Sequence, residues 1–542
     1  MADWTSSQRY YSTRDSHEDE SGYLSFEEVV LQGLAKDGGL FIPQSIPSLP
    51  ADWFAKWKNL SFADLAFEVM SLYISRSEIN ASELKDIVQK SYSVFRAPEV
   101  TPLIPLSAAQ NLYLLELFHG PTFAFKDVAL QFLGNLFEFF LVRRNSKLGA
   151  QEERHHLTVI GATSGDTGSA AIYGLRGKKD VSVFIMFPKG RVSPVQEAQM
   201  TTVPDSNVHC VTVDGTFDDC QDIVKALFAD DEIKKTQHLA AVNSINWARI
   251  LAQITYYFYS YFSLLKNEST SPSKVRFVVP SGNFGDILAG FFAQRMGLPV
   301  ANLLIATNEN DILHRFFTSG SYTKQTHSEP KINKGLPADG SLATPDAVIS
   351  TLSPAMDILV SSNFERLLWI LSYESALSNS SSTHDARAHA GKQINSWFAS
   401  LKSAGSFAVP TSLLEGGKRN FSSERVSDPE TLETIKHVYH NTPEHYVLDP
   451  HSAVGVAASL RSIKSHPNDA HISLSTAHPA KFSSAVELAL KEEQGFSFEK
   501  ILPQEFVGLE KKERRFVAVE KKLGLWGIRK VILDGVKGES ER

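Results

Sequence analysis

Two glycine-rich segments each stand between an apolar run and a helical pattern. They are Gly161–Gly168, with the sequence GATSGDTG, and Pro280–Asp286, with the sequence PSGNFGD. In a parallel sheet such turns lie at the carboxyl ends of strands, where backbone N–H groups and a helix N-terminus form an anion site. Neither segment contains the Gly-Lys-Ser/Thr of a P-loop, and neither matches the dinucleotide pattern G-x-G-x-x-G. A tight structural turn is the alternative for each one, whereas the pair indicates two anions or one ligand with two anionic ends.

A single lysine, Lys126, lies among aromatic residues in the segment His119–Asp127 (HGPTFAFKD). The largely apolar helical run Val128–Phe140 follows directly. Burial lowers the pKa of a lysine and makes its amine usable as a nucleophile or a base. An isolated lysine is more often a solvated surface group, but the apolar setting and the two anion loops favour a chemical role for Lys126.

Alternating strand and helix patterns supply the elements that must position these residues. Helices are expected from about Ser169, after Thr216 as N-cap, and from about Asp286. The predicted strands are Leu157–Ile160, Val181–Phe187, Val208–Val213, Val275–Val279, Leu303–Ala306, Tyr446–Leu448 and Ile472–Leu474. This alternation predicts an α/β fold of parallel sheets with right-handed crossovers.

In the first hundred residues, the pattern predicts mainly helices instead. Ser25–Glu28 has the capping-box pattern, and helical periodicity recurs at Phe62–Ile74 and Ser82–Ser91. Two polar stretches, Ser321–Ala347 and Ser375–Gly391, predict surface insertions too polar to pack.

The composition excludes several classes of protein. The 542 residues are 42% hydrophobic and 21% charged, which is typical of globular domains. Since 54 basic residues face 61 acidic ones, a net charge of −7 argues against a general nucleic-acid binder. The two cysteines, Cys210 and Cys220, fit neither a disulfide framework nor a zinc site. No apolar run approaches the ~18 residues of a membrane span, and Met1–Gly22 resembles no targeting peptide. We therefore expect a cytoplasmic protein without a membrane segment or a metal.

Taken together, several segments resemble the threonine synthase family of pyridoxal-phosphate enzymes, in its longer fungal form. The resemblance runs over nearly the whole length and is specific because many motifs coincide. The matching segments are Tyr11–Arg14, Gln32–Pro43, His119–Gln131, Gly161–Gly168, Asn243–Arg249, Ser281–Asp286, Asp449–Gly455 and Ser475–Phe482.

This resemblance implies a cofactor, pyridoxal 5'-phosphate, and a role for each matching residue. Lys126 would be the Schiff-base lysine and later the mobile acid and base. The cofactor phosphate would be bound by the backbone of Gly282, Asn283, Phe284 and Gly285. Asp286 would begin the following helix, with its side chain as a cap or toward loop amides, since a carboxylate repels phosphate. Ser452 would hydrogen-bond the pyridine nitrogen, and a neutral partner leaves that nitrogen largely unprotonated.

The resemblance also implies two sites for the substrate. The loop residues Thr163, Ser164, Gly165, Asp166 and Thr167 would receive its α-carboxylate. Its phosphate would be bound by Asn243, Ser244 and Arg249, because an arginine offers a bidentate fork of donors. A structural ion pair with an acidic neighbour is the alternative for Arg249.

The implied fold consists of two doubly wound α/β domains of the tryptophan-synthase-β-like type, plus a helical N-terminal domain. The expected boundaries are 1–100 for the helical domain, 101–150 with 241–500 for the large cofactor-binding domain, 151–240 for the small domain and 501–542 for a C-terminal extension. The implied reaction converts O-phospho-L-homoserine and water to L-threonine and phosphate by γ-elimination and β-hydration.

Two other functions stay open at this point. One is a pyridoxal-phosphate lyase of the same fold, such as a threonine or serine dehydratase, whose substrate carries no phosphate for Asn243–Arg249 to bind. The other is a noncatalytic relative, against which the presence of Lys126 and Ser452 argues. The sequence leaves open whether the chain is a monomer or a homo-oligomer.

Overall fold

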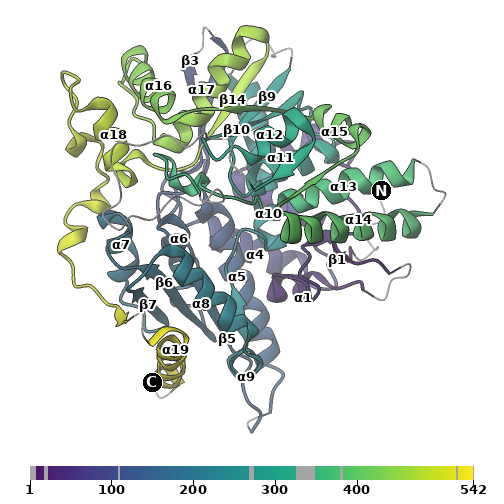
Figure 1. The fold of residues 1–542 in the computed structure, drawn as a ribbon, viewed down its shortest axis with the longest axis vertical. Helices are drawn as coiled ribbons and strands as arrows, with labels where there is room; N and C mark the ends of the chain where they lie inside the picture. Colours follow the sequence, from purple (N-terminus) through teal and green to yellow (C-terminus); the bar gives the residue numbers. More distant parts are fainter. Residues whose placement is uncertain are drawn as a thin grey trace.

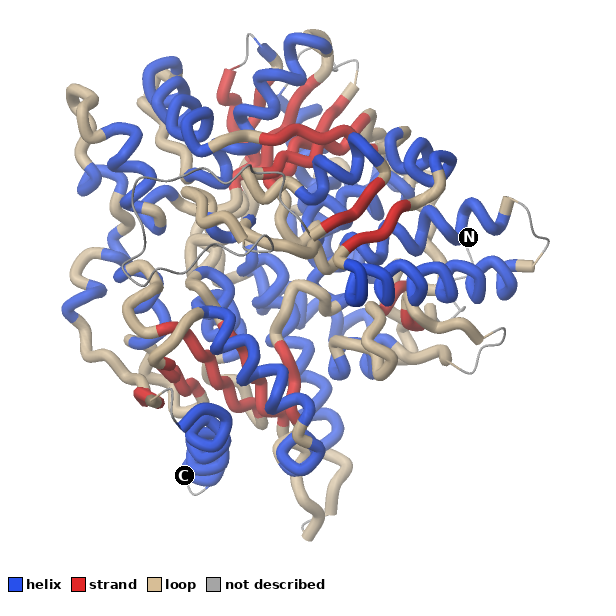
Figure 2. Tube along the Cα trace, viewed as in Figure 1, coloured by secondary structure: helices blue, strands red, loops and turns tan. Residues whose placement is uncertain are grey.

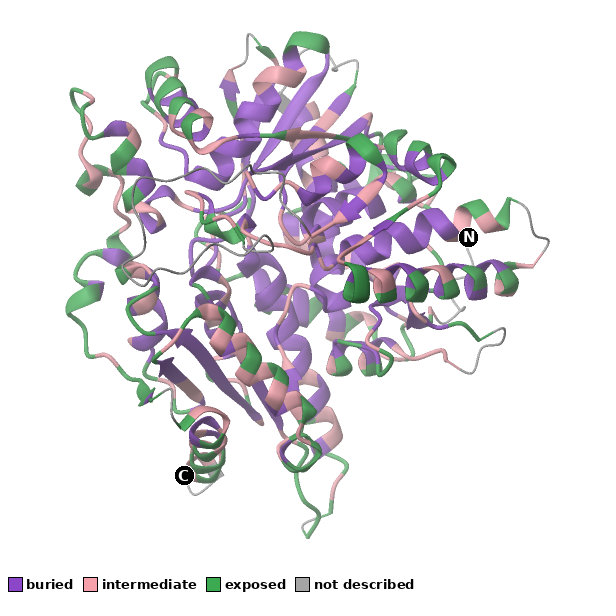
Figure 3. Cartoon of the chain, viewed as in Figure 1, coloured by how far each residue is buried: buried purple, intermediate pink, exposed green. Residues whose placement is uncertain are grey.

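Two β-sheets, built from different stretches of the chain, organise the fold (Figures 1 and 2). The computed structural model describes residues 8–17, 22–107, 110–149, 151–267, 274–324, 348–378, 382–520 and 523–540. In Figure 1 the larger sheet lies in the upper half of the molecule and the smaller sheet in the lower half. The strands of both sheets are largely buried (Figure 3) because helices cover both of their faces, as parallel sheets require.

The larger sheet has the strand order β13-β10-β9-β14-β4-β3 and is parallel except for the antiparallel pair β3–β4. Its strands are β3 (Leu103–Ser107), β4 (Leu112–Glu116), β9 (Val275–Pro280), β10 (Asn302–Thr307), β13 (Phe421–Arg425) and β14 (Ala470–Ser475). Helix α17 (Pro450–Ser465) packs on β9, β10 and β14, and α11 (Gly285–Met296) and α12 (Ile312–Ser319) also contact the sheet.

The smaller sheet has the order β15-β7-β6-β5-β8 and is parallel throughout. Its strands are β5 (Leu157–Ala162), β6 (Val181–Pro188), β7 (Val208–Val213), β8 (Leu239–Ala241) and β15 (Val517–Val519). Helix α6 (Asp166–Leu175) contacts β6 and packs on α5 (Lys126–Asn145), and α8 (Phe217–Ala229) packs on β5 and β6. The terminal helix α19 (Gly524–Ser540) lies against α8 and β15. The last part of the chain therefore contributes a strand and a helix to the smaller sheet.

Six of the seven predicted strands are confirmed, and Tyr446–Leu448 is wrong. The Tyr446 backbone N–H donates to the Thr442 hydroxyl at 2.8 Å, and its phenol donates to Glu116 at 2.6 Å. Val447 and Leu448 pack in an apolar cluster beside the sheet. Side-chain partners and burial hold this extended segment, so it needs no neighbouring strand.

The N-terminal region is mostly helical, as expected, with one short strand pair. Its elements are β1 (Tyr10–Ser12), α1 (Phe26–Gln32), β2 (Phe41–Pro43), α2 (Trp53–Trp57), α3 (Phe62–Ser71) and α4 (Ala81–Tyr92). The capping box at Ser25 is confirmed, and Asn80 forms a second one. Thr13 donates to Glu365 at 2.6 Å and Arg14 forms an ion pair with the same carboxylate at 2.8 Å, which ties this region to the larger α/β unit.

The predicted insertion Ser375–Gly391 is wrong. Of these residues, 375–377 end α13 (Phe364–Leu377) and 383–391 begin α14 (Thr383–Ala404), two helices packed on each other, while 379–381 lie outside the described residues. A Cβ on Gly391 would lie 2.0 Å from the carbonyl oxygen of Asp15, so the polar run forms a close helix contact. Of the other predicted insertion, 321–323 form β11 (Ser321–Thr323), paired with β12 (Ser406–Ala408), and 325–347 lie outside the described residues.

The remaining helices complete the layers around both sheets. They are α7 (Pro194–Thr201), α9 (Asp231–Thr236), α10 (Trp247–Asn267), α15 (Thr411–Lys418), α16 (Asp428–Asn441) and α18 (Ser483–Leu490). Cys210 and Cys220 are buried free thiols. None of the described helices has the length and apolar character needed to cross a membrane.

Candidate active site

Lys126 is the first residue of α5, and the turn before it is tightly built. The Thr122 backbone N–H and hydroxyl both donate to the Asp127 carboxylate, each at 2.7 Å. A Cβ on Gly120 would lie 2.4 Å from the Cβ of Asp127, so only glycine fits there. Phe123 takes a φ of 60°, a left-handed conformation that is strained for an aromatic residue. The turn thus fixes the position of Lys126 at the start of α5 and the direction of its side chain.

The amine of Lys126 lies in a buried and electrostatically mixed environment. Burial, together with the charges of Lys481 and Arg249, lowers the pKa of Lys126 to about 8, although Asp166 and Asp127 oppose this shift. The structure therefore brings together Lys126, Asp166 and Arg249, three predicted site residues from distant segments. A lysine with a pKa near neutrality has an appreciable fraction of neutral, nucleophilic amine.

The second glycine-rich loop is held in place by hydrogen bonds from the residues at the start of α13. The Ser361 hydroxyl donates to the carbonyl of Gly282 at 2.7 Å, and the Asn363 backbone N–H donates to the carbonyl of Asn283 at 3.0 Å. Phe284 takes a left-handed φ of 61° at the N-cap of α11, with its ring buried. Ser361 and Asn363 thus fix the loop at the N-terminus of α11, where the first N–H groups of the helix have no partner within the helix and can bind an anion.

Asp286 corrects one expectation. Its side chain neither caps α11 nor binds the loop amides, because it accepts hydrogen bonds from the hydroxyls of Tyr256 and Tyr257 on α10, the latter at 2.9 Å. Burial raises the pKa of Asp286 to about 6, although the two tyrosines lower it. The carboxylate thereby joins α10 to α11.

Arg249 lies in the first turn of α10 and is buried, with 4% of its surface exposed. Its Nε and Nη1 atoms have no hydrogen-bond partner among the described residues, which argues against the structural ion pair. Burial lowers the pKa of Arg249 to about 10, so it is still charged near neutral pH. Nearby, the Asn243 side chain accepts from the backbone N–H of Ile245 at 3.3 Å. A buried cation with free donors is a site prepared for an anion.

The first glycine-rich loop is shaped by its own threonine. The Thr163 hydroxyl accepts from the backbone N–H groups of Gly165 and Gly168, at 3.0 and 2.9 Å. Helix α6 begins at Asp166, three residues earlier than predicted, because the loop turns directly into the helix. Ser164 is exposed and Thr167 half-buried, so these two hydroxyls are the accessible ones of the loop.

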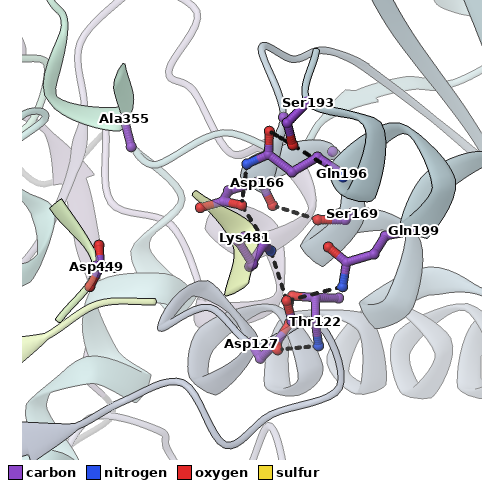
Figure 4. A network of polar contacts seen from close by, with 12 residues as sticks. Thr122, Asp127, Asp166, Ser169, Ser193, Gln196, Gln199, Ala355, Asp449 and Lys481 are labelled. Atoms are coloured by element: carbon purple, nitrogen blue, oxygen red, sulfur yellow. Dashed lines mark hydrogen bonds and ion pairs between the residues drawn. The ribbon is translucent and has the colours of Figure 1, made fainter. Parts of the chain in front are cut away.

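A buried lysine that the sequence did not single out, Lys481, connects this loop to the Lys126 segment (Figure 4). Its Nζ pairs with Asp166 at 2.8 Å and donates to the carbonyl of Thr122 at 2.7 Å. Gln196 of α7 also donates to Asp166, at 2.8 Å. Burial raises the pKa of Asp166, but Lys481 and Lys126 outweigh it and hold that pKa well below its usual range. Asp166 is therefore a buried carboxylate whose partners, Lys481 and Gln196, belong to the protein itself.

Ser452 lies in a second polar network, at the start of α17. Its hydroxyl donates to Asp449, contacts the Ser475 hydroxyl at 2.9 Å and accepts from the backbone N–H of Thr476 at 3.1 Å. Asp449 also contacts Nδ1 of His451 at 2.9 Å, and Nε2 of His451 accepts from the backbone N–H of Ala355 at 3.1 Å. Because Nε2 accepts, Nδ1 carries the proton of a neutral ring. Sequence reasoning missed Asp449 and His451, although both stand in the segment that contains Ser452.

These residues fit pyridoxal phosphate by their chemistry. Lys126 offers a buried amine, the N-terminus of α11 offers backbone donors, and Arg249 offers a second anion site. Among the described residues, no group of three His, Cys, Asp or Glu side chains is arranged to hold a metal ion.

Comparisons with known proteins agree with this chemistry. Three family models match: Threonine synthase N terminus over residues 9–92, Pyridoxal-phosphate dependent enzyme over 94–357, and Threonine synthase, C-terminal over 452–532. The threonine synthase of Schizosaccharomyces pombe is 58% identical over 511 residues, covering 93% of this chain and 94% of the relative. That of Saccharomyces cerevisiae is 55% identical over 523 residues, covering 95% and 96%.

Solved structures agree as well. The crystal structure of threonine synthase from yeast matches with a TM-score of 0.89 at 53% identity, covering 98% of this chain and 99% of that one. The pyridoxal-phosphate-bound threonine synthase from Brucella melitensis matches with a TM-score of 0.81 at 37% identity, with the same coverage of 98% and 99%. Because sequence and fold agree over nearly the whole length, the chain belongs to the threonine synthase family of pyridoxal-phosphate-dependent lyases, and pyridoxal phosphate is its cofactor.

Proposed function

We propose that this chain converts O-phospho-L-homoserine and water to L-threonine and phosphate. The observation that carries the proposal is Arg249, a buried guanidinium with free donors close enough to Lys126 to lower its pKa. A substrate with a phosphate at one end and a carboxylate at the other supplies the anion that Arg249 lacks. The substrate of a dehydratase carries no phosphate and would leave that cation buried without a partner, which is costly.

Lys126 attaches the cofactor, and the backbone N–H groups at the start of α11, in Gly282–Gly285, bind its phosphate. In this proposal the Ser452 hydroxyl would turn its one proton from Asp449 to the ring nitrogen, and Asp286 acts at a distance by holding α10 against α11. When bound, the cofactor supplies an electron sink that lets protons leave the carbons near the amino group. Lys126 accepts and returns those protons, since its lowered pKa suits both tasks at neutral pH.

The substrate spans two anion sites in this proposal. Its carboxylate binds at the N-terminus of α6, where the hydroxyls of Ser164 and Thr167 are accessible. Its phosphate binds Arg249, with Asn243 and Ser244 beside it at the start of α10. Asp166 does not contact the carboxylate; paired with Lys481, it holds the loop in place.

We also propose the expected division into domains, with one refinement. Strands from residues 103–116 and 275–475 build the larger sheet, and strands from 157–241 build the smaller one. Because β15 and α19 pack on the smaller sheet, we assign 517–540 to the small domain and not to a separate extension. For the cellular site we propose the cytoplasm, which suits two buried free thiols.

The direct test is incubation of the purified chain with O-phospho-L-homoserine. Phosphate and threonine should appear in equal amounts, while L-serine and L-threonine offered as substrates should give no oxo acid. Oxo acid from L-threonine, with no phosphate released from phosphohomoserine, would identify a dehydratase.

Arg249→Ala tests the phosphate site separately. Removing a charge-assisted contact, worth about 1.5–3 kcal/mol, should weaken substrate binding about 10- to 150-fold, with cofactor binding unchanged. Arg276→Ala is the matched control, because Arg276 pairs with Asp469 at the opposite end of β9. Equal substrate affinity in the Arg249→Ala variant and the unmodified chain would remove Arg249 from the site.

A further inference from the structure

One side-chain amide touches both segments to which we assign phosphate binding. The Nδ2 of Asn363 donates to the carbonyl of Ser244 at 3.1 Å and to the carbonyl of Asn283 at 3.0 Å. Ser244 belongs to the substrate-phosphate segment and Asn283 to the cofactor-phosphate loop. We propose that Asn363 is a positioning residue that holds these two segments in one fixed relation, so that binding of phosphate in one site strengthens binding in the other. The inference rests on the proposed function, since it takes Asn243–Arg249 as the substrate-phosphate segment.

The placement of Asn363 in its own helix supports this role. Asn363 occupies the N-cap position of α13, where an asparagine side chain ordinarily accepts from the first turn of the helix. Here it makes no capping hydrogen bond, and both of its N–H donors go to other segments. Asn363 is fully buried, so bulk water cannot take the place of either hydrogen bond.

Arg366 fixes which way the amide of Asn363 points. Its Nη1 donates to Oδ1 of Asn363, so the amide oxygen faces Arg366 and the amide nitrogen faces the two loops. Its Nη2 donates to the carbonyl of Ile245 at 2.7 Å, and its Nε donates to the carbonyl of Phe41 at 2.8 Å. Asn363 and Arg366 therefore hold two successive carbonyls, those of Ser244 and Ile245, from one side.

The contact with the cofactor loop is equally close. The Asn363 backbone N–H donates to the same Asn283 carbonyl at 3.0 Å, so that oxygen receives two donors from one residue. A Cβ on Gly285 would lie 3.2 Å from Nδ2 of Asn363, which leaves little room for the loop to shift. An anion that orders either segment also orders the Asn363 amide that both segments share. The second anion then binds at a smaller cost in conformational entropy.

The experiment measures coupling and uses the holoenzyme. The rate at which pyridoxal phosphate leaves the protein is followed by its visible absorbance, with and without saturating inorganic phosphate as the probe. In the unmodified chain, phosphate should slow this loss at least about fivefold, the lower end of usual coupling between sites. In Asn363→Leu, a neutral variant of similar size, the ratio of the two rates should fall to near one.

Asn207→Leu is the matched control. Asn207 is also buried, and its Nδ2 also donates to two carbonyls, those of Leu175 and Val181, at 3.0 and 2.8 Å, but it lies in the smaller sheet unit. This variant should lose stability comparably and keep the ratio of the unmodified chain. If Asn363→Leu does not fold, Asn363→Ser, which keeps a hydroxyl for Arg366, replaces it and the same ratio decides.

The outcomes separate this inference from the proposed function. If the unmodified chain forms threonine but phosphate does not slow cofactor loss, or slows it equally in the Asn363 variant, the positioning role is wrong and the function stands. If the chain releases no phosphate from phosphohomoserine, the proposed function is wrong, and the inference falls with it. Loss of coupling in Asn207→Leu to the same extent would also overturn it, because a general loosening would then explain the effect.

Discussion

Lys126 and Lys481 lie in one neighbourhood, and both are buried, yet their surroundings differ. Lys481 pairs with Asp166 at 2.8 Å and donates to the Thr122 carbonyl at 2.7 Å. Lys126, in contrast, has no hydrogen bond or ion pair to any described residue, and burial lowers its pKa to about 8. Burial alone therefore does not make a reactive amine. The partner makes the difference: the Asp166 carboxylate holds the Lys481 amine in place, while the Lys126 amine stays free to react.

The largest expected effect comes from Lys126→Ala. It removes both the attachment of the cofactor and the proton carrier, so threonine formation should fall by at least about 10⁴-fold. The visible absorbance of the bound cofactor and its reduction by borohydride are the measurements. A borohydride-reducible adduct that survives in this variant would show that Lys481 can replace Lys126, and the contrast between the two lysines would fail.

Lys481→Met should act mainly on stability. It leaves Asp166 as a buried carboxylate without its cation, which costs about 3–5 kcal/mol of unfolding free energy. Urea denaturation measures the loss, and the double variant with Asp166→Asn should recover much of it. As a control, Lys90→Met removes an exposed ion pair to Glu138 and should cost less than about 1 kcal/mol. If the Lys481→Met variant is as stable as the Lys90→Met variant, the ion pair between Lys481 and Asp166 does not stabilise the fold as proposed.

Gln196→Met should have a smaller effect in the same network. It removes the Gln196 donor from Asp166, a hydrogen bond to a charged group worth about 1.5–3 kcal/mol. Gln199→Met is the control on the same helix, because Gln199 donates to a neutral carbonyl, that of Thr122, at 3.3 Å, and should cost only about 0.5–1.5 kcal/mol. Equal losses would mean that the charge of Asp166 plays no part.

The smallest effect concerns pH. The neutral amine of Lys126 is the form that takes up the cofactor, so the rate of reconstitution of the full chain should rise with pH, with a midpoint near pH 8. Lys481 and Arg249 lower this pKa, and Asp166 and Asp127 raise it. Lys481→Met removes a like charge and frees Asp166, so the midpoint should move upward. If the midpoint of the Lys481→Met variant stays in place or moves downward, the charge of Lys481 does not lower the pKa of Lys126.

Local patterns predicted what depends on neighbours along the chain. The strand Val208–Val213 and the Thr216 cap of α8 were correct because alternation and capping are decided within a few residues. Lys126 was identified because aromatics and an apolar helix flank it directly. The glycine-rich loops were identified because a strand, a turn and a helix follow one another in sequence.

Contacts between distant residues account for the failures. The run Ser375–Gly391 has the composition of a polar insertion, but α13 packs on α14 there and the Asp15 backbone lies against Gly391. Asp286 takes its direction from two tyrosines on α10, and Lys481 takes its role from Asp166, far earlier in the chain. No short window of sequence contains either pair.

Strand β15 has a consequence for synthesis on the ribosome. The strands β5 to β8 are translated together, but β15, the strand that covers the free side of β7, is made only after all strands of the larger sheet. Until then the nascent chain presents an open strand edge and the apolar surface that α19 later covers, where Gly535 packs on Phe184. Open edges invite pairing with other chains. A ribosome that stalls or terminates before Val517 therefore releases a chain whose smaller sheet is prone to aggregation.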